Sequence, residues 1–115
     1  PSSIILALIS SGFNGQQFTF HGYLPIDKSE KKSKIIWLEN QAHKTGVSQI
    51  FMETPYRNLQ LFEDLCNILS PDTKLCIAAN INHPSREFIK TRTIKQWKKQ
   101  PPQLHKIPAV YVLGR

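Results

Sequence analysis

The amino-acid sequence predicts an α/β domain with a mixed sheet of about five strands flanked by helices. Segments that favour strands alternate along the chain with segments that favour helices, as in layered α/β domains. Apolar residues make up 40% of the chain and charged residues 20%, which is typical of folded domains rather than disordered ones. The length of 115 residues fits one domain over residues 1–115, with a core that needs no disulfide or metal cross-links.

The N-terminal part of the chain is expected to form a helix followed by a strand. Ser2 or Ser3 is a natural N-cap for a helix over residues 4–11, and Gly12 is a natural C-terminal stop. Over residues 18–24, aromatic residues alternate with other residues, which predicts a strand that ends at the following proline. The segment between them contains two glycines and an asparagine, and we expect it to be a loop.

A second helix and a second strand are expected next. Asp27 or Ser29 can cap a helix that continues towards Gly46, and the short apolar segment over residues 47–52 predicts a strand. Several lysines lie in the first turns of this helix, where cations oppose the helix dipole. We therefore interpret them as a solvated face in preference to a nucleic-acid patch. These lysines are Lys28, Lys31, Lys32 and Lys34.

The clearest helix pattern lies over residues 56–69, where apolar residues recur at three- and four-residue steps. We expect Leu59, Phe62 and Leu65 to face the core of the domain. A Ser-Pro-Asp turn follows the helix, and the apolar segment over residues 74–80 then predicts a buried strand.

The last third of the chain gives weaker patterns. A turn is expected over residues 82–85, and a weak alternation over residues 87–93 indicates a strand. Thr93 can cap a short helix, which the prolines at 101–102 interrupt. The apolar segment over residues 108–113 predicts a final strand.

Charge and cysteine content limit the possible partners and compartments. Fifteen Lys and Arg against eight Asp and Glu give a net charge of +7, which favours anionic partners such as nucleic acid or phosphates, although ordinary solubility charge explains it as well. Cys66 and Cys76 lie in apolar surroundings and are expected to be buried free thiols of a cytoplasmic protein. The longest apolar run, residues 4–9, is far shorter than the ~20 residues of a membrane helix, so we expect no membrane partner.

Two strand-to-helix junctions are the best candidates for a functional site. The sequence has no Walker loop, dinucleotide fingerprint, zinc-ligand spacing or nucleophile elbow. In α/β sheets, however, ligands bind beyond the carboxyl ends of the strands. Residues 52–57 place a thioether, a carboxylate, a hydroxyl, a phenol and a guanidinium after one expected strand, and residues 78–80 end another with small side chains that allow a planar ligand to approach. Ordinary helix entry explains Thr54 and Pro55 equally well.

Three segments together resemble the second half of the tetrapyrrole-methylase family of S-adenosylmethionine-dependent methyltransferases. They cover residues 7–13, 17–25 and 53–57. The most similar branch is that of the ribosomal RNA ribose 2′-O-methyltransferases, in which a helix, a loop and a strand ending in Gly-[Tyr/Phe]-Leu-Pro precede an acidic strand end, a hydroxyl residue and an arginine. The resemblance covers almost the whole chain. Each segment alone is a weak signal, but the ordered set is fairly specific.

The resemblance implies a two-domain enzyme with S-adenosylmethionine in the cleft between the domains. The chain starts at Pro1, without a methionine, and we expect a boundary inside a longer protein whose N-terminal domain is missing here. Further expected partners are RNA as the substrate and a second copy of the chain in a homodimer. This half alone is expected to be inactive and to bind the cofactor weakly, because half of a cleft supplies half of the contacts.

The resemblance and the two junctions together give a set of candidate site residues. Those expected to bind the cofactor are Met52, Glu53, Thr54, Ala78, Ala79, Asn80, Pro108 and Ala109. Those expected to contact the substrate are Phe13, Asn14 and Arg57, although a structural salt bridge explains Arg57 and a surface turn explains the other two. We assign no catalytic residue and no metal ligand.

Other functions remain open from the sequence. After the strand over residues 74–80, the ribosomal branch has a charged Arg-Glu-Leu-Thr-like stretch, whereas this chain continues with Asn80-Ile81-Asn82-His83. This departure bears on the RNA substrate more than on the cofactor. One alternative is therefore methylation of a tetrapyrrole or another small molecule by the full-length enzyme, and another is a stand-alone basic binding module without catalysis.

Overall fold

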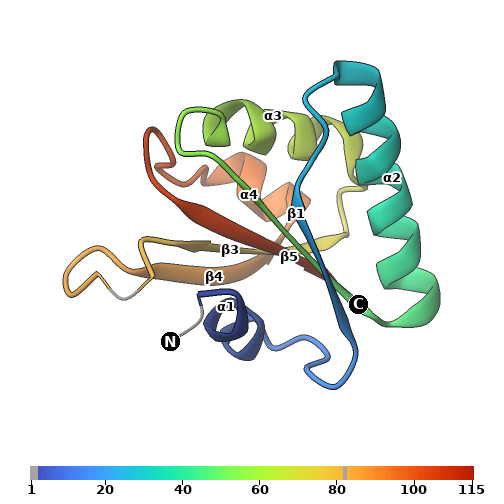
Figure 1. The fold of residues 1–115 in the computed structure, drawn as a ribbon, viewed down its shortest axis with the longest axis horizontal. Coiled ribbons are helices and arrows are strands. Elements are labelled where there is room, and N and C mark those ends of the chain that lie inside the picture. The colour runs from blue at the N-terminus through green and yellow to red at the C-terminus, as the bar shows by residue number, and fades with distance from the viewer. Residues whose placement is uncertain (1–2, 82) are drawn as a thin grey trace.

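A computed structural model describes residues 3–81 and 83–115 and confirms the α/β fold class (Figure 1). The expected cap at Ser2 and the first residue of the expected turn, Asn82, lie outside the described residues. The helices and strands follow the expected order, and the shifts at their ends are small. They are α1 (Ser3–Ser11), β1 (Phe18–Tyr23), α2 (Lys28–Thr45), β2 (Ser48–Glu53), α3 (Asn58–Ile68), β3 (Lys74–Ala79), β4 (Phe88–Thr93), α4 (Ile94–Lys99) and β5 (Ala109–Gly114).

The five strands form one mixed sheet in the order β1-β2-β5-β3-β4. β1 and β2 are parallel, whereas β5 is antiparallel to both of its neighbours, β2 and β3. β2 and β3 therefore run in the same direction with β5 between them, and they end at the same edge of the sheet. α1 covers one face of the sheet, and α2, α3 and α4 lie on the other (Figure 1).

Capping groups fix the helix ends where the sequence indicates them. The Asp27 carboxylate accepts a hydrogen bond from the Glu30 N–H at 3.0 Å, and backbone hydrogen bonding of this kind lowers the pKa of Asp27. Gly46 ends α2 in the left-handed conformation, with a φ of 74° that glycine adopts without steric cost. Thr93 and Gln96 form a capping box at the start of α4.

Side chains alternate between the two faces of the sheet, so each strand contributes to two separate clusters. In β3, Leu75 and Ile77 belong to the larger cluster, beneath the three helices, whereas Cys76 and Ala78 belong to the cluster beneath α1. Both cysteines are free and buried, as expected from the sequence. Burial raises the pKa of the Cys76 thiol to about 11, so this thiol is neutral at physiological pH.

The inward face of α3 differs from the expected one at one position. Phe62 and Leu65 are buried as expected, but the expectation for Leu59 was wrong, because its side chain is 46% exposed. The buried stripe includes Asn58 and Leu61 instead. Successive helix residues are about 100° apart, so Leu59 lies well round the helix from Asn58 and outside this stripe.

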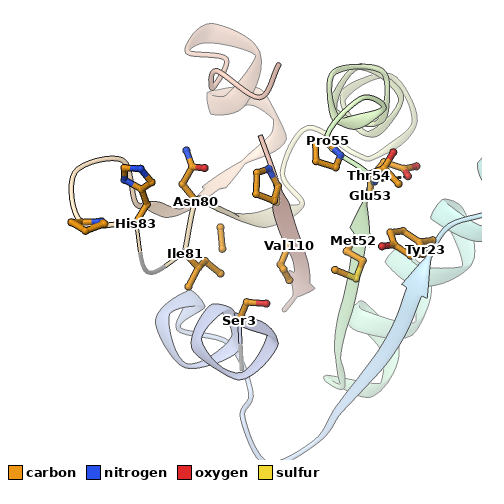
Figure 2. Close-up of a pocket in the computed structure, with 14 residues that line it drawn as sticks. Ser3, Tyr23, Met52, Glu53, Thr54, Pro55, Asn80, Ile81, His83 and Val110 are labelled. Atoms are coloured by element: carbon orange, nitrogen blue, oxygen red, sulfur yellow. Dashed lines mark hydrogen bonds between the residues drawn. The ribbon is translucent and has the colours of Figure 1, made fainter. Parts of the chain in front are cut away.

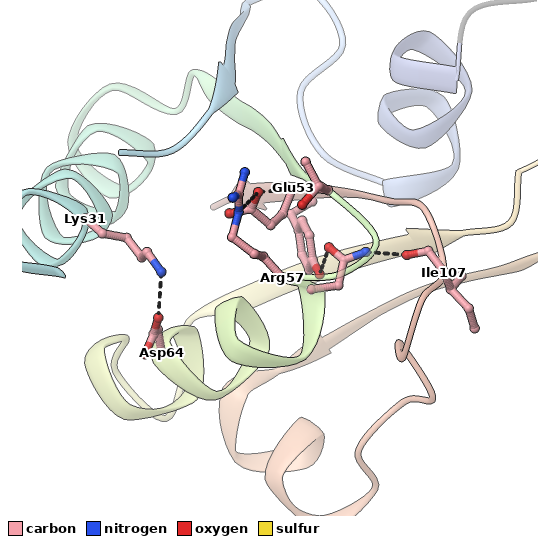
Figure 3. A network of polar contacts seen from close by, with 8 residues as sticks. Lys31, Glu53, Arg57, Asp64 and Ile107 are labelled. Carbon is pink, nitrogen blue, oxygen red and sulfur yellow. Dashed lines mark hydrogen bonds and ion pairs between the residues drawn. The ribbon is translucent and has the colours of Figure 1, made fainter. Parts of the chain in front are cut away.

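The reason that α3 buries a polar residue is a hydrogen-bonded bridge to β5 (Figure 3). The Asn58 side-chain amide donates a hydrogen bond to the Ile107 carbonyl, and its oxygen accepts one from the Tyr111 hydroxyl at 2.9 Å. Burial, with a smaller contribution from the charge of Glu53, raises the pKa of Tyr111 well above its usual range. The hydroxyl therefore stays protonated and remains a donor.

Replacing Asn58 with Leu is expected to lower the free energy of unfolding by about 2–4 kcal/mol, because the buried Tyr111 hydroxyl and the partly buried Ile107 carbonyl lose their partner at once. Tyr111→Phe removes only the hydroxyl and should cost less, about 1–2 kcal/mol. Urea denaturation of the purified chain measures both values. An Asn58→Leu variant as stable as the wild type would show that the bridge contributes nothing.

Candidate functional site

A pocket of about 510 Å³ lies at the edge of the sheet where β2 and β3 end and β5 begins (Figure 2). Ala109, the first residue of β5, is opposite Glu53 on one side and opposite Ala79 on the other. This register brings together the two junctions that the sequence analysis selected. β5 lies between β2 and β3 and is antiparallel to both, so the two junctions meet across it. In the simplest α/β arrangement, the two junctions would follow directly adjacent parallel strands.

Most of the expected cofactor residues line this pocket, together with residues that the sequence analysis missed. The expected residues in the lining are Met52, Glu53, Thr54, Ala78, Asn80, Pro108 and Ala109. The additional ones are Ser3, Tyr23, Pro55, Ile81, His83, Pro84 and Val110.

The floor of the pocket is a row of apolar side chains on the α1 face of the sheet. Val110 is opposite Met52 in β2 and opposite Ala78 in β3, so these three side chains lie next to one another across three strands. Ala78 and Val110 are 0% and 4% exposed. Ser3, at the start of α1, lies beside this row (Figure 2). The arrangement presents a flat, apolar surface with one small residue in it.

Ala79 does not line this pocket. Its neighbour Ala78 faces α1, and the alternation of a strand turns Ala79 to the opposite face, where it is 3% exposed within the larger core cluster. The two alanines were expected to act together because both are small. The pleat of the strand separates them.

Backbone geometry shapes the walls on both sides of the floor. Asn80 has a φ of 52°, in the left-handed region, and its N–H donates a hydrogen bond to the Pro108 carbonyl at 3.2 Å. The Asn80 carbonyl accepts a hydrogen bond from the His83 N–H at 2.9 Å. The chain therefore turns sharply out of β3 and forms a wall beside the pocket.

Tyr23 enters the pocket lining because β1 is irregular near its end. The pairing of β1 with β2 shifts between Phe20 and Tyr23, and Gly22 lies in the irregular stretch with a φ of 68°. Such an irregularity redirects the following side chain. A glycine inside an alternating strand pattern is a known sign of a bulge, so Gly22 was the available signal for Tyr23.

Glu53 and Arg57 form an ion pair at the rim of the pocket (Figure 3). The Glu53 side chain is only 3% exposed, and its carboxylate accepts hydrogen bonds from the Thr54 N–H at 2.8 Å and from the Arg57 Nε at 3.2 Å. Arg57 thus forms the structural salt bridge that was the alternative to a substrate contact. The Arg57 side chain is 46% exposed, so it still has contact with solvent.

Phe13 and Asn14 lie at the opposite edge of the sheet from the pocket. Phe13 packs against Gly114, the last residue of β5, whereas the pocket lies at the first. The Asn14 side chain accepts hydrogen bonds from the backbone N–H groups that follow it and donates one to the Gly46 carbonyl at 3.2 Å. Both residues hold the loop before β1 in place, and the pocket does not include the expected substrate contacts at these positions.

The packing of Phe13 on Gly114 leads to a testable expectation. A Cβ atom added at Gly114 would overlap the Phe13 ring, so Gly114→Ala should lower the free energy of unfolding by about 1–3 kcal/mol. Combining it with Phe13→Ala removes the overlap. The double variant should therefore be less destabilised than the sum of the two single variants, as measured by urea denaturation. Additive costs would mean that the two residues are independent.

Two further findings concern the described residues 3–81 and 83–115. Among them, no group of three or more His, Cys, Asp or Glu side chains is arranged to hold a metal ion. None of the helices in this part of the chain has the length and apolar character needed to cross a membrane.

No protein-family model matches the chain, but individual proteins do. It is 27% identical over 81 residues to the ribosomal RNA small subunit methyltransferase I of Vibrio cholerae, an alignment that covers 70% of this chain and 27% of that protein. The protein of the same name from Thermotoga maritima is 29% identical over 105 residues, which cover 89% of this chain and 45% of that protein. The chain thus spans less than half the length of these relatives.

The fold also matches solved structures. A cobalt precorrin-4 methyltransferase superimposes with a TM-score of 0.59 over 98% of this chain and 48% of that one, at 15% sequence identity. At that identity the match shows a shared fold only.

Proposed function

By sequence and by fold this chain is a relative of the tetrapyrrole-methylase family of methyltransferases, and from that premise we propose that it is the C-terminal half of an S-adenosylmethionine-dependent enzyme. The observation that supports a cofactor site in this half is the pocket at the ends of β2 and β3. Two junctions far apart in the sequence meet there, and both were selected because ligands bind at such strand ends.

The residues of the pocket fit one part of this cofactor well. A planar adenine group needs a flat apolar surface, and the row of Met52, Val110 and Ala78 is such a surface. The small side chain of Ala78 leaves room for a ring to approach, and the thioether of Met52 adapts to the shape of a ligand. The turn at Asn80 and the start of β5 supply backbone polar groups at the edges of the floor.

Within this proposal, the chain's own residues position the reactants and keep water away. When bound, S-adenosylmethionine would supply a methyl group: the bond from a substrate oxygen to the methyl carbon would form as the carbon–sulfur bond breaks in line with it, the sulfur would leave as a thioether, and the hydroxyl proton would pass to solvent. Such a displacement gains most from orientation and from a dry site. The buried Ala78 and Val110 exclude water from the floor, and the ion pair between Glu53 and Arg57 fixes the rim. We assign no general base to this half.

The proposed substrate is the RNA of the small ribosomal subunit, methylated at a ribose 2′-hydroxyl. The names of the sequence relatives support the RNA, and the resemblance to the 2′-O-methylating branch supports the ribose. The proposal also places the intact protein in the cytoplasm. The intact protein would carry an N-terminal domain before this half and would form a homodimer. The net charge of +7 is consistent with an RNA partner.

The direct test is methyl transfer by the intact protein. Tritiated S-adenosylmethionine is incubated with small ribosomal subunits that have not been methylated, and the RNA is then hydrolysed in alkali. A 2′-O-methyl group blocks the neighbouring phosphodiester from cleavage, so label should appear in alkali-stable dinucleotides. Label in mononucleotides would refute the ribose as acceptor, and the absence of label in RNA would refute the proposed substrate.

A further inference from the structure

The net positive charge of the chain is concentrated in its last third. Residues 74–115 contain nine Lys and Arg and a single acidic residue, Glu87, for a net charge of +8. Residues 1–73 contain six Lys and Arg and seven Asp and Glu, for a net charge of −1. If the positive charge served solubility alone, there would be no reason for it to gather in one part of the chain. This segment forms β3, β4, α4 and β5, and β4 is an outermost strand of the sheet (Figure 1).

Alternation along β4 places two of these cations on one face. Lys90 is opposite Ile77, and Arg92 is opposite Leu75, and both of these partners belong to the core beneath α2, α3 and α4. Phe88, opposite Ala79, lies on the same face. Residues two apart on a strand are ~6.6 Å apart, so Phe88, Lys90 and Arg92 form a regular row. Arg86 precedes the strand by two residues and is exposed.

Both cations of this row lie beside an aromatic ring. The Lys90 Nζ lies 5.4 Å from the centre of the Phe88 ring, and the Arg92 guanidinium lies 4.9 Å from the centre of the Trp97 ring. Lys90 and Arg86 are exposed, so both can reach a ligand. Trp97 is 0% exposed, so of these two rings Phe88 is the one at the surface. Cations beside an accessible aromatic ring are typical of surfaces that hold single-stranded nucleic acid, where phosphates meet the charges and bases stack on the rings.

The row leads to a second pocket of about 660 Å³, which shares Asn80 with the candidate cofactor pocket. Its lining includes two cations, Arg86 and Lys106, together with Phe88 and the prolines at 101–102. None of its lining residues carries a carboxylate. Ala79 also lines it, on the face of β3 opposite to Ala78. The basic row and the cofactor pocket thus meet at the turn that follows β3.

We propose that the basic row of Arg86, Lys90 and Arg92, with Lys106 across the second pocket, binds the sugar-phosphate backbone of the substrate RNA and leads it to the turn at Asn80. This inference rests on the proposed function, because it assigns a path to the RNA that the enzyme would methylate. Phosphate contacts fix the position of a nucleic acid without reading its sequence, so the row supplies affinity and orientation. Phe88 offers a base a surface to stack on.

The test uses the intact protein and a fluorescein-labelled single-stranded RNA of 20 nucleotides, with affinity measured by fluorescence anisotropy at several salt concentrations. One triple variant carries Arg86→Gln, Lys90→Gln and Lys106→Gln. Arg92 is kept because it packs on Trp97. The matched control removes the same charge from exposed positions of α2, with Lys28→Gln, Lys32→Gln and Lys44→Gln.

The triple variant of the row should bind the RNA at least tenfold more weakly at 0.1 M salt. Its slope of log affinity against log salt should be shallower by about 2, since each phosphate contact on a single strand contributes about 0.7. The control should change affinity by less than threefold. Circular dichroism and the melting temperature verify that both variants are folded, and S-adenosylmethionine binding should be equal in the two.

Two results would overturn the inference, and they distinguish a wrong RNA path from a wrong RNA substrate. If the wild type methylates RNA and the two triple variants bind RNA equally well, the path is wrong but the proposed function stands. If the wild type neither binds nor methylates RNA, both the path and the RNA substrate are wrong.

Discussion

Replacing Ala78 with Leu should weaken the binding of S-adenosylmethionine to the intact protein by more than tenfold, or about 1.4 kcal/mol. The expected loss follows from the floor of the pocket, where Ala78 lies beside Val110 and is 0% exposed. A leucine there adds three carbons to the flat surface and fills the space that a planar group needs. Isothermal titration calorimetry measures the dissociation constant directly.

The matched control is the adjacent residue, Ala79, which faces the other side of the sheet. Ala79→Leu should lower the free energy of unfolding by about 1–3 kcal/mol through overpacking. Its affinity for S-adenosylmethionine should stay within threefold of the wild type. If the two substitutions weakened cofactor binding equally, the assignment of the pocket to the α1 face would be wrong.

Replacing Trp97 with Ala should produce the largest loss of stability, about 3–5 kcal/mol. Trp97 is 0% exposed, and its indole N–H donates a hydrogen bond to the Leu75 carbonyl at 2.8 Å. The ring also lies edge-on to Phe62 at 6.4 Å and near Phe88 at 6.1 Å. Single domains have a net stability of only about 5–15 kcal/mol, so the variant should be largely unfolded in mild urea.

The second tryptophan of the chain provides the control for this experiment. Trp37 is 46% exposed on α2, and Trp37→Ala should lower the free energy of unfolding by less than about 1 kcal/mol. Urea denaturation followed by far-UV circular dichroism compares the two without relying on tryptophan fluorescence. Equal costs at the two positions would contradict the burial that the structure gives to Trp97.

The sequence predicted the elements of the fold because their signals are local. The caps at Asp27 and Thr93 and the stop at Gly46 each depend on a few neighbouring residues, and the structure has all three. The order of strands in the sheet is not local. No residue near Ala109 indicates that β5 inserts between β2 and β3, since that depends on the packing of the whole chain.

The candidate site was predictable in its location and less so in its details. The strand ends at Met52 and Ala78 line one pocket because β5 pairs with both β2 and β3. Both ends could be selected from the sequence by the general rule that ligands bind beyond strand ends in α/β sheets. The rule does not say which of two successive alanines faces the ligand, and the pleat decides against Ala79. Phe13 was expected to contact the substrate, but its ring packs against Gly114, a contact between distant parts of the chain.

The most direct test of the central claim is a crystal structure of the intact protein with S-adenosylhomocysteine, the product of methyl transfer. We expect density for the adenine ring over the row of Met52, Val110 and Ala78, at the edge of the sheet where β2 and β3 end. Density for the nucleoside at another place, with this row in contact only with solvent or protein, would contradict the claim that this half forms a wall of the methyl-donor site.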